Sequence, residues 1–424
     1  MKYPKSLSEK WETACGGAFA RALRWTVPYR PLWGCADRSA SRTAKIPRRL
    51  PFPIFQTGSK AMAGWLFGLG MLLTVSMAQA GNSPADSGAF VATNQAAPSA
   101  RNEGGAWLFA YFRQRYESRV EIDTNGITQT VPLPNPMRLE QLHFALSSDG
   151  RHWTPLNDNG PVWHHWLRDP YLHPGPDGLW HLVATGGSSA KRPGESRPRP
   201  VCLYAESRDL VNWTNVHSLL LMTGVLDETG RPARNIWAPE WFFDQKNGSY
   251  FVFWSSSFED QGWKHSRLWF ARTRDWQTFT PAKVLFQPPY SAIDGTLWEQ
   301  DGKYSLFHKE EEFGASKGER RAIRLATADQ LEGPYTIYEG PLNGGQIAPV
   351  ISEGPEIMPD PKSAGWLLIY DYCMSNGYGV STSSDLIHWS VETSVAFPPD
   401  ARHGCFAQLT ETEAGRLRAT YGQK

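Results

Sequence analysis

The sequence predicts an all-β fold, a five-bladed β-propeller, and two observations carry this prediction. The first is a motif in which an aspartate stands four residues before an aromatic residue. It recurs at Asp149, Asp209, Asp275 and Asp385, with a degenerate copy at Asp329. The second is an apolar, strand-like run ahead of each motif, with no long helical period between copies. Copies 54 to 66 residues apart leave room for four short strands and a tight turn, as in a propeller blade. A β-sandwich, the alternative, predicts no repeat of this length.

The apolar runs mark the second strand of each expected blade, at 107–112, 180–185, 250–254, 304–308 and 366–370. The run 250–254 is apolar on both alternating faces, which is typical of a strand covered on both sides. One more strand is predicted at 402–409. Because the first blade lacks an upstream partner strand, we expect this last strand to complete it and close the ring. Thr410 and Glu413 then form a capping box for a short C-terminal helix.

The N-terminal segment 1–80 reads as a leader rather than as part of the fold. An apolar run from Ala61 to Ala78 follows Lys60, and Ala78-Gln79-Ala80 offers a cleavage site, which together predict a secretory signal peptide. The run is short for a membrane span, so we expect no stable span after cleavage; an uncleaved anchor is the alternative. The Arg- and Pro-rich residues before Lys60 suggest a true start later than Met1. Residues 81–104 are predicted to be a flexible linker, and 105–424 the propeller domain.

Charge and cysteine content limit the class of partner. Residues 1–80 hold 12 of the 43 basic residues and 3 of the 42 acidic ones, so 31 basic and 39 acidic residues remain. An acidic mature chain argues against a nucleic acid partner. Cys15 and Cys35 fall in the leader, and Cys202, Cys373 and Cys405 lie far apart without metal-ligand spacing. We expect buried thiols, with one disulfide plus a free thiol as the alternative.

Four acidic residues precede the apolar strands at similar distances from the repeat aspartates: Asp169, Glu240, Asp294 and Glu353. Because the innermost strand of each blade lines the central channel, we expect these carboxylates to meet at one mouth of it. Carboxylates held close together acquire different pKa values. Hydrolysis of a glycosidic bond uses one protonated and one ionised carboxyl. The alternative is that the acids cap strands or bind a structural ion.

The motifs Arg168-Asp169-Pro170, Trp237-Ala238-Pro239-Glu240, Ala292-Ile293-Asp294 and Ser352-Glu353-Gly354-Pro355 form an ordered set. By these motifs, the sequence resembles glycoside hydrolase family 43, whose five-bladed propellers include arabinofuranosidases, xylosidases and arabinanases. The resemblance runs from about Ala106 to the C-terminus. The resemblance implies that Asp169 is the general base, Glu353 the general acid and Asp294 the residue that tunes the pKa of the acid. It also implies inversion at the anomeric carbon. One position departs from the family pattern, because Gly295 stands where a proline usually follows the aspartate.

Other residues extend the expected site. Trp237, Glu240 and Arg402 are candidates for substrate contact, and Trp163 is a further candidate for stacking on a sugar. By the resemblance, His403 lies at the propeller axis and meets a calcium ion, although no cofactor is required; a hydrogen-bonded core histidine is the alternative. We therefore expect a secreted or periplasmic inverting hydrolase that removes arabinofuranosyl or xylosyl units from plant carbohydrates. The alternatives are a β-D-galactofuranosidase, or a related exo-glycosidase of the same fold, and a propeller that binds carbohydrate without catalysis.

Overall fold

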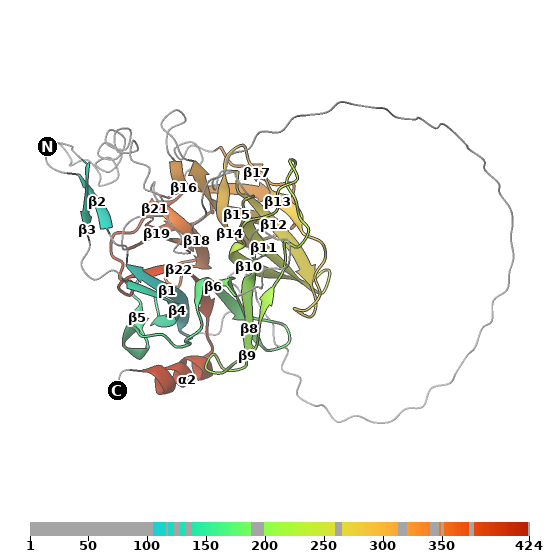
Figure 1. Ribbon diagram of the computed structural model, residues 1–424. Helices are drawn as coiled ribbons and strands as arrows, with labels where there is room; N and C mark the ends of the chain where they lie inside the picture. Colours follow the sequence, from blue (N-terminus) through green and yellow to red (C-terminus); the bar gives the residue numbers. More distant parts are fainter. Residues whose placement is uncertain are drawn as a thin grey trace, which may run out of the picture. The chain divides into compact units, whose positions relative to one another are not determined.

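The computed structural model describes residues 105–115, 118–122, 128–132, 137–187, 199–258, 265–312, 320–339, 347–348, 352–372 and 377–422 (Figure 1). The predicted leader, signal peptide and linker, together with Cys373, lie outside these residues. Within them, no helix is long and apolar enough to cross a membrane.

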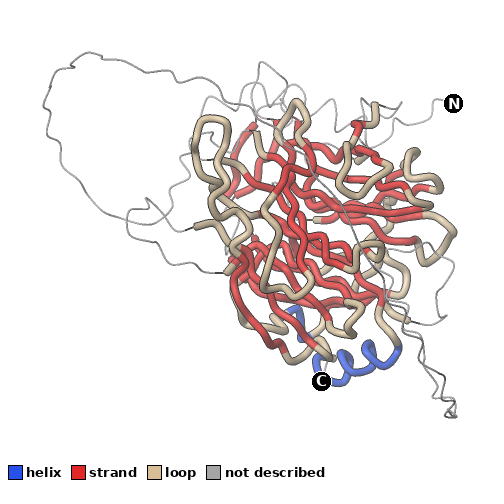
Figure 2. Tube along the Cα trace, turned by 90° about the vertical axis from the view of Figure 1, so that its right-hand side faces the viewer, coloured by secondary structure: helices blue, strands red, loops and turns tan. Residues whose placement is uncertain are grey.

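Five antiparallel four-stranded sheets make up the described fold, so the predicted all-β five-bladed propeller is confirmed (Figures 1 and 2). Blade 1 contains β22 (Ala401–Gln408), β1 (Trp107–Arg115), β4 (Met137–Ser147) and β5 (Thr154–Pro155). Blade 2 contains β6 (Leu167–Pro174), β7 (Trp180–Gly186), β8 (Cys202–Ser207) and β9 (Trp213–Leu219). Blade 3 contains β10 (Trp237–Asp244), β11 (Ser249–Ser256), β12 (Arg267–Thr273) and β13 (Lys283–Phe286).

Blade 4 contains β14 (Ala292–Gln300), β15 (Lys303–Glu312), β16 (Arg320–Ala328) and β17 (Thr336–Ile337). Blade 5 contains β18 (Ser352–Pro359), β19 (Trp366–Tyr372), β20 (Tyr378–Ser383) and β21 (Ser390–Val391). Outside the blades are a hairpin of β2 (Ser118–Ile122) and β3 (Thr128–Pro132), the 3-10 helix η2 (Asn157–Asn159) and the C-terminal helix α2 (Glu411–Tyr421).

The inner strands of the blades are β22, β6, β10, β14 and β18, and each contacts the next in this order, with β18 returning to β22. Strand β22 comes from the C-terminus and pairs with β1 from the start of the domain, Trp107 opposite Gln408. This pairing is consistent with the predicted closure of the ring by the last strand. The beginnings of the inner strands therefore form one mouth of the channel.

The repeated aspartate explains the turn that follows the third strand in four blades. In blade 3, Asp275 Oδ1 accepts hydrogen bonds from the backbone N–H groups of Gln277 and Thr278, at 2.9 and 2.8 Å. The same pair of bonds recurs at Asp149, Asp209 and Asp385. The backbone bonds hold the pKa of Asp275 below its usual range. The repeat is thus a local backbone cap rather than part of a catalytic site.

The C-terminal helix and the two described cysteines of the propeller domain agree with the predictions made for them. Thr410 Oγ1 accepts a hydrogen bond from the backbone N–H of Glu413, and the Glu413 side chain accepts one from the backbone N–H of Thr410, which is the predicted capping box. The Trp180 indole also donates to Glu413 Oε1, at 3.0 Å, which ties the helix to blade 2. Cys202 and Cys405 are buried free thiols.

Candidate active site

A one-residue bulge interrupts every inner strand near the mouth and sets the geometry of the site. The pairing register shifts after Arg168 in β6, Trp237 in β10, Ile293 in β14 and Glu353 in β18, and around His403 in β22. The residue that follows each of the first four has a left-handed backbone conformation, namely Asp169 (φ 46°), Ala238 (41°), Asp294 (49°) and Gly354 (55°). The bulge places these residues and His403 at equivalent positions, which we call the bulge layer.

Two neighbouring layers follow from the same register. The residues one position earlier, nearer the mouth, form the outer layer: Arg168, Trp237, Ile293, Glu353 and Arg402. The residues two positions later form the inner layer: Tyr171, Glu240, Thr296, Glu356 and Cys405. The four acids, although at similar distances from the repeat aspartates in the sequence, therefore do not all occupy equivalent positions. Asp169 and Asp294 share the bulge layer, whereas Glu353 lies in the outer layer and Glu240 in the inner layer.

Glu353 lies between two buried cations. Its Oε2 is 2.8 Å from Lys309 Nζ and its Oε1 is 2.6 Å from Arg402 Nη2. The side chains of Lys309 and Arg402 are only 1% and 2% exposed, respectively. Arg402 also contacts Asp371 Oδ1 at 3.2 Å, and Asp371 Oδ2 accepts the backbone N–H of His403. Charges this deeply buried persist only when they are paired, so the cluster fixes the position of the Glu353 carboxylate.

Asp169 and Asp294 occupy the bulge layer in blades 2 and 4. Asp169 Oδ1 lies 3.6 Å from His403 Nδ1, and its side chain is 10% exposed. Asp294 Oδ2 accepts the backbone N–H of Gly354 at 3.2 Å. Burial raises the pKa of Asp294 to about 6, against the opposing electrostatic effect of the neighbouring His403 and Lys309. Asp294 is therefore an acid that changes its charge near neutral pH.

The inner layer holds a second pair of acids, Glu240 and Glu356. Burial raises the pKa of Glu356 to about 8, and burial together with the charge of Glu356 raises that of Glu240. Ligand atoms of both acids and of His403 lie within 4.8 Å of one another, and Glu240 Oε2 has no hydrogen-bond partner among the described residues. Calcium prefers oxygen ligands, and two carboxylates facing a single buried point fit such an ion.

The other predicted contacts lie in different surroundings. Trp237 is half-buried in the outer layer, and its carbonyl accepts a hydrogen bond from Ser255 Oγ at 3.2 Å. Trp163 stacks on Trp213 with ring centroids 5.5 Å apart, so it packs the surface of blade 2. The Arg168 guanidinium lies over the ring of Phe112 on β1, at 5.2 Å from its centroid. The Arg168 side chain therefore packs against blade 1.

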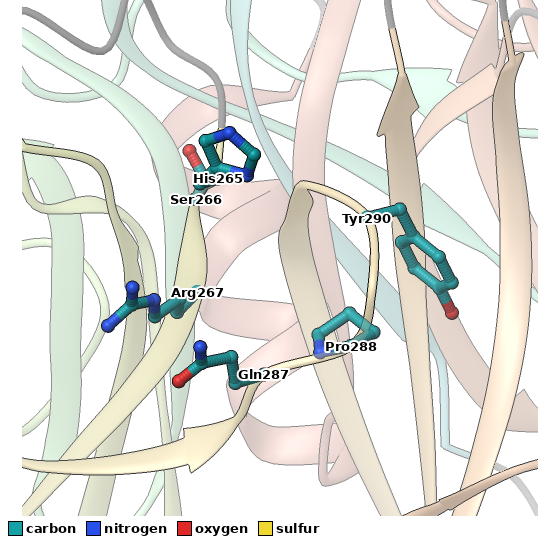
Figure 3. Close-up of a pocket in the computed structure, with 6 residues that line it drawn as sticks. All are labelled: His265, Ser266, Arg267, Gln287, Pro288 and Tyr290. Atoms are coloured by element: carbon teal, nitrogen blue, oxygen red, sulfur yellow. The ribbon is translucent and has the colours of Figure 1, made fainter. Parts of the chain in front are cut away.

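A small pocket of about 160 Å³ lies at the start of β12 and beside the turn that leads into β14 (Figure 3). His265, Ser266, Arg267, Gln287, Pro288 and Tyr290 line it, and it contains none of the predicted site residues. Arg267 pairs with Glu228 at 2.7 Å, and Tyr290 Oη lies 2.9 Å from His308 Nε2. Arg267 and Tyr290 therefore each contact a residue outside this lining set, and Figure 3 shows the two side chains pointing in different directions.

Some residues of the site carry only a weak signal in the sequence. Asp371 stands in an ordinary apolar strand run, and nothing near it indicates a partner for Arg402. Lys309 ends another such run and precedes three glutamates, which reads as a solvated loop. The layers, by contrast, can be found in the sequence. Aligning the four inner strands on Pro170, Pro239, Gly295 and Pro355 brings the left-handed residues into one column, because each of these four positions directly follows one of them.

Comparison with known proteins identifies the family. Residues 135–415 match the model of a family related to glycoside hydrolase family 43, described as a probable glycosyl hydrolase domain. The protein is thus a propeller of the glycoside hydrolase class, and the chain belongs to this family 43-related family of glycosyl hydrolase domains.

A curated α-L-arabinofuranosidase from Bifidobacterium longum is 29% identical over 219 residues, which are 45% of this chain and 20% of that protein. The chain therefore spans only a fifth of this relative. Among solved structures, a family 117 glycoside hydrolase from Zobellia galactanivorans gives a TM-score of 0.43 at 15% identity, covering 55% of this chain and 70% of the other. The native arabinanase from Bacillus subtilis gives 0.39 at 18% identity, covering 55% and 79%. At these TM-scores the family assignment rests on the sequence match.

Proposed function

We propose that the protein is a secreted, inverting glycoside hydrolase that removes arabinofuranosyl or xylosyl units from plant polysaccharides or oligosaccharides. The observation that carries this proposal is the bulge register, which gives Asp169, Asp294 and Glu353 adjoining positions at the mouth of the channel in three blades. Family membership supports hydrolysis as the reaction, and the α-L-arabinofuranosidase among the relatives supports arabinofuranose as the first sugar to test.

The proposed roles follow from the resemblance. Asp169 takes a proton from water as the water attacks the anomeric carbon, and Glu353 gives a proton to the leaving oxygen from the other side of the sugar. A water molecule between the two carboxyls requires inversion of the anomeric centre. Lys309 and Arg402 hold Glu353 in place, and the negative charge of Asp294 is lost or gained near pH 6. Precise placement of this kind accounts for a large share of enzymatic rate enhancement.

We propose further that Glu240, Glu356 and His403 hold the calcium ion that the resemblance implies. When bound, the ion would supply positive charge at the propeller axis, below the reacting groups. The chain itself brings the two acids and the imidazole within reach of one point.

The experiment is an assay of the purified protein on 4-nitrophenyl arabinofuranoside, xyloside and galactofuranoside, with the anomer of the first-formed product identified by NMR. We expect release from the arabinofuranoside or the xyloside with inversion. Release from the galactofuranoside alone would identify the alternative sugar. Sugar binding without release from any substrate would establish a non-catalytic binding propeller and refute the enzyme proposal.

Variants of the two reacting acids test the roles. Asp169→Asn and Glu353→Gln should each abolish turnover while the circular dichroism spectrum stays that of the wild type. Near-normal turnover in either variant would contradict the assignment. Export is tested separately by N-terminal sequencing of the protein secreted from a host, which should begin after Ala80.

A further inference from the structure

Trp166 is the one large aromatic side chain that the described residues leave mostly exposed, at 51%. It lies one residue before β6 and three before Asp169, on the mouth side of the inner strand. Single exposed apolar side chains are common on protein surfaces, so the exposure of Trp166 does not by itself indicate a ligand. What distinguishes Trp166 is its position, at the start of the inner strand that carries Asp169.

The structure fixes the orientation of this ring. The Trp166 indole N–H donates to Glu140 Oε2 on β4, at 2.8 Å. Arg168, two residues further along, also turns toward blade 1, where it lies over Phe112. Within the part of the chain that the structure describes, no other aromatic ring stacks on Trp166. The carboxylate of Glu140 thus holds the polar edge of the indole and leaves an apolar face uncovered.

We propose that Trp166 is a stacking surface for the leaving-group sugar of an oligosaccharide substrate, an inference that rests on the function proposed above. In the proposed arrangement the sugar to be released lies toward Asp169, whose side chain is largely buried, and the remainder of the oligosaccharide lies across the rim at Trp166. Three residues of strand separate the two positions by about 10 Å. A sugar ring presents an apolar C–H face to such an indole and keeps its hydroxyl groups in water.

The test compares Trp166→Ala, Trp166→Phe and Glu140→Ala with the wild type. The substrates are arabinotriose, xylotriose and the methyl glycosides of arabinofuranose and xylose, which lack a second sugar. Trp166→Ala should raise KM for the cleaved triose by about tenfold, with a much smaller change in kcat, because truncation of a well-used aromatic contact has this size of effect. Trp166→Phe should lie between the two. Glu140→Ala keeps the ring but frees its orientation, so a smaller rise in KM is expected.

Val391→Ala is the control, since Val391 on β21 is 50% exposed and far from the acids in the propeller register. It should behave as the wild type on every substrate. An equal loss on trioses and methyl glycosides in Trp166→Ala would mean that Trp166 supports the fold or the first sugar, and would overturn the proposal. Unchanged KM for the triose would overturn it as well.

Calorimetric binding of the trioses separates this proposal from the proposed function. If the wild type binds a triose without cleaving it and Trp166→Ala weakens binding about tenfold, hydrolysis is refuted and the stacking surface stands. If the wild type cleaves the triose and Trp166→Ala binds it equally well, the stacking surface is refuted and hydrolysis stands. Binding of neither triose by the wild type refutes the stacking surface.

Discussion

Asp294→Asn should become more stable than the wild type as the pH rises from acid to neutral. Burial raises the pKa of Asp294 from 3.8 to about 6, which means that the fold favours its protonated form. The stability that Asp294 contributes is therefore fully present below about pH 4 and is lost as the pH rises through 6. Since a tenfold change in proton affinity corresponds to about 1.4 kcal/mol, the loss amounts to about 3 kcal/mol.

The assay is urea unfolding of wild type and Asp294→Asn at pH 4, 5, 6, 7 and 8. An asparagine has no charge to bury, and its side-chain oxygen still accepts the Gly354 N–H. The difference in free energy of unfolding should grow in favour of the variant by up to about 3 kcal/mol between pH 4 and 7. Asp329→Asn, at an exposed aspartate, should show no such trend. A difference for Asp294→Asn that is constant across pH would refute the reasoning.

Three further predictions concern the neighbours of the proposed catalytic acids. In urea unfolding, Gly354→Ala should destabilise the fold by about 2 kcal/mol more than Gly224→Ala. Both glycines have positive φ, so the backbone strain is similar. Of the two, only Gly354 would bring a Cβ against a side chain, the His403 ring at 2.5 Å. Lys309→Met removes the cation that lies 2.8 Å from Glu353 Oε2 and holds its carboxyl in place, so kcat should fall at least tenfold. Loss of this positive charge should also alter the pH–rate profile. An unaltered profile would contradict the prediction. Calcium should raise the melting temperature of the wild type, and a chelator should reverse this rise. Glu356→Gln should show no rise with calcium. No response in the wild type would refute the ion site.

The sequence predicted the blades well because four of the five blades carry the same local signal. The aspartate of the repeat satisfies two backbone N–H groups of a tight turn, a need that recurs in four blades with the same residue at the same place. Such a signal acts over four residues and does not depend on the rest of the chain. The number of blades and the positions of the second strands therefore followed from the sequence alone.

The layers of the site did not follow from that signal. Counting back from the repeat aspartates crosses a hairpin of variable length, and a change of one residue moves a side chain to the opposite face of a strand. Counting of this kind does not distinguish Glu240 and Glu353, which lie in the layers on either side of Asp169, from Asp169 itself. The ion pairs of Lys309 and Asp371 join strands of different blades, and no local pattern specifies such a contact.

Gly295 shows how the fold absorbs a departure from the family pattern. A proline follows the left-handed residue in blades 2, 3 and 5, whereas Gly295 follows it in blade 4. A glycine at this position predicts a looser backbone at Asp294. The backbone of Asp294 nevertheless has φ 49°, close to the 46° of Asp169 beside its proline. A Cβ on Gly295 would lie 2.6 Å from Leu268 Cδ1, so the leucine of β12 fills the space that a larger residue needs. Leu268 of blade 3 therefore lies beside Gly295, and Asp294 has nearly the same φ as Asp169 although no proline follows it.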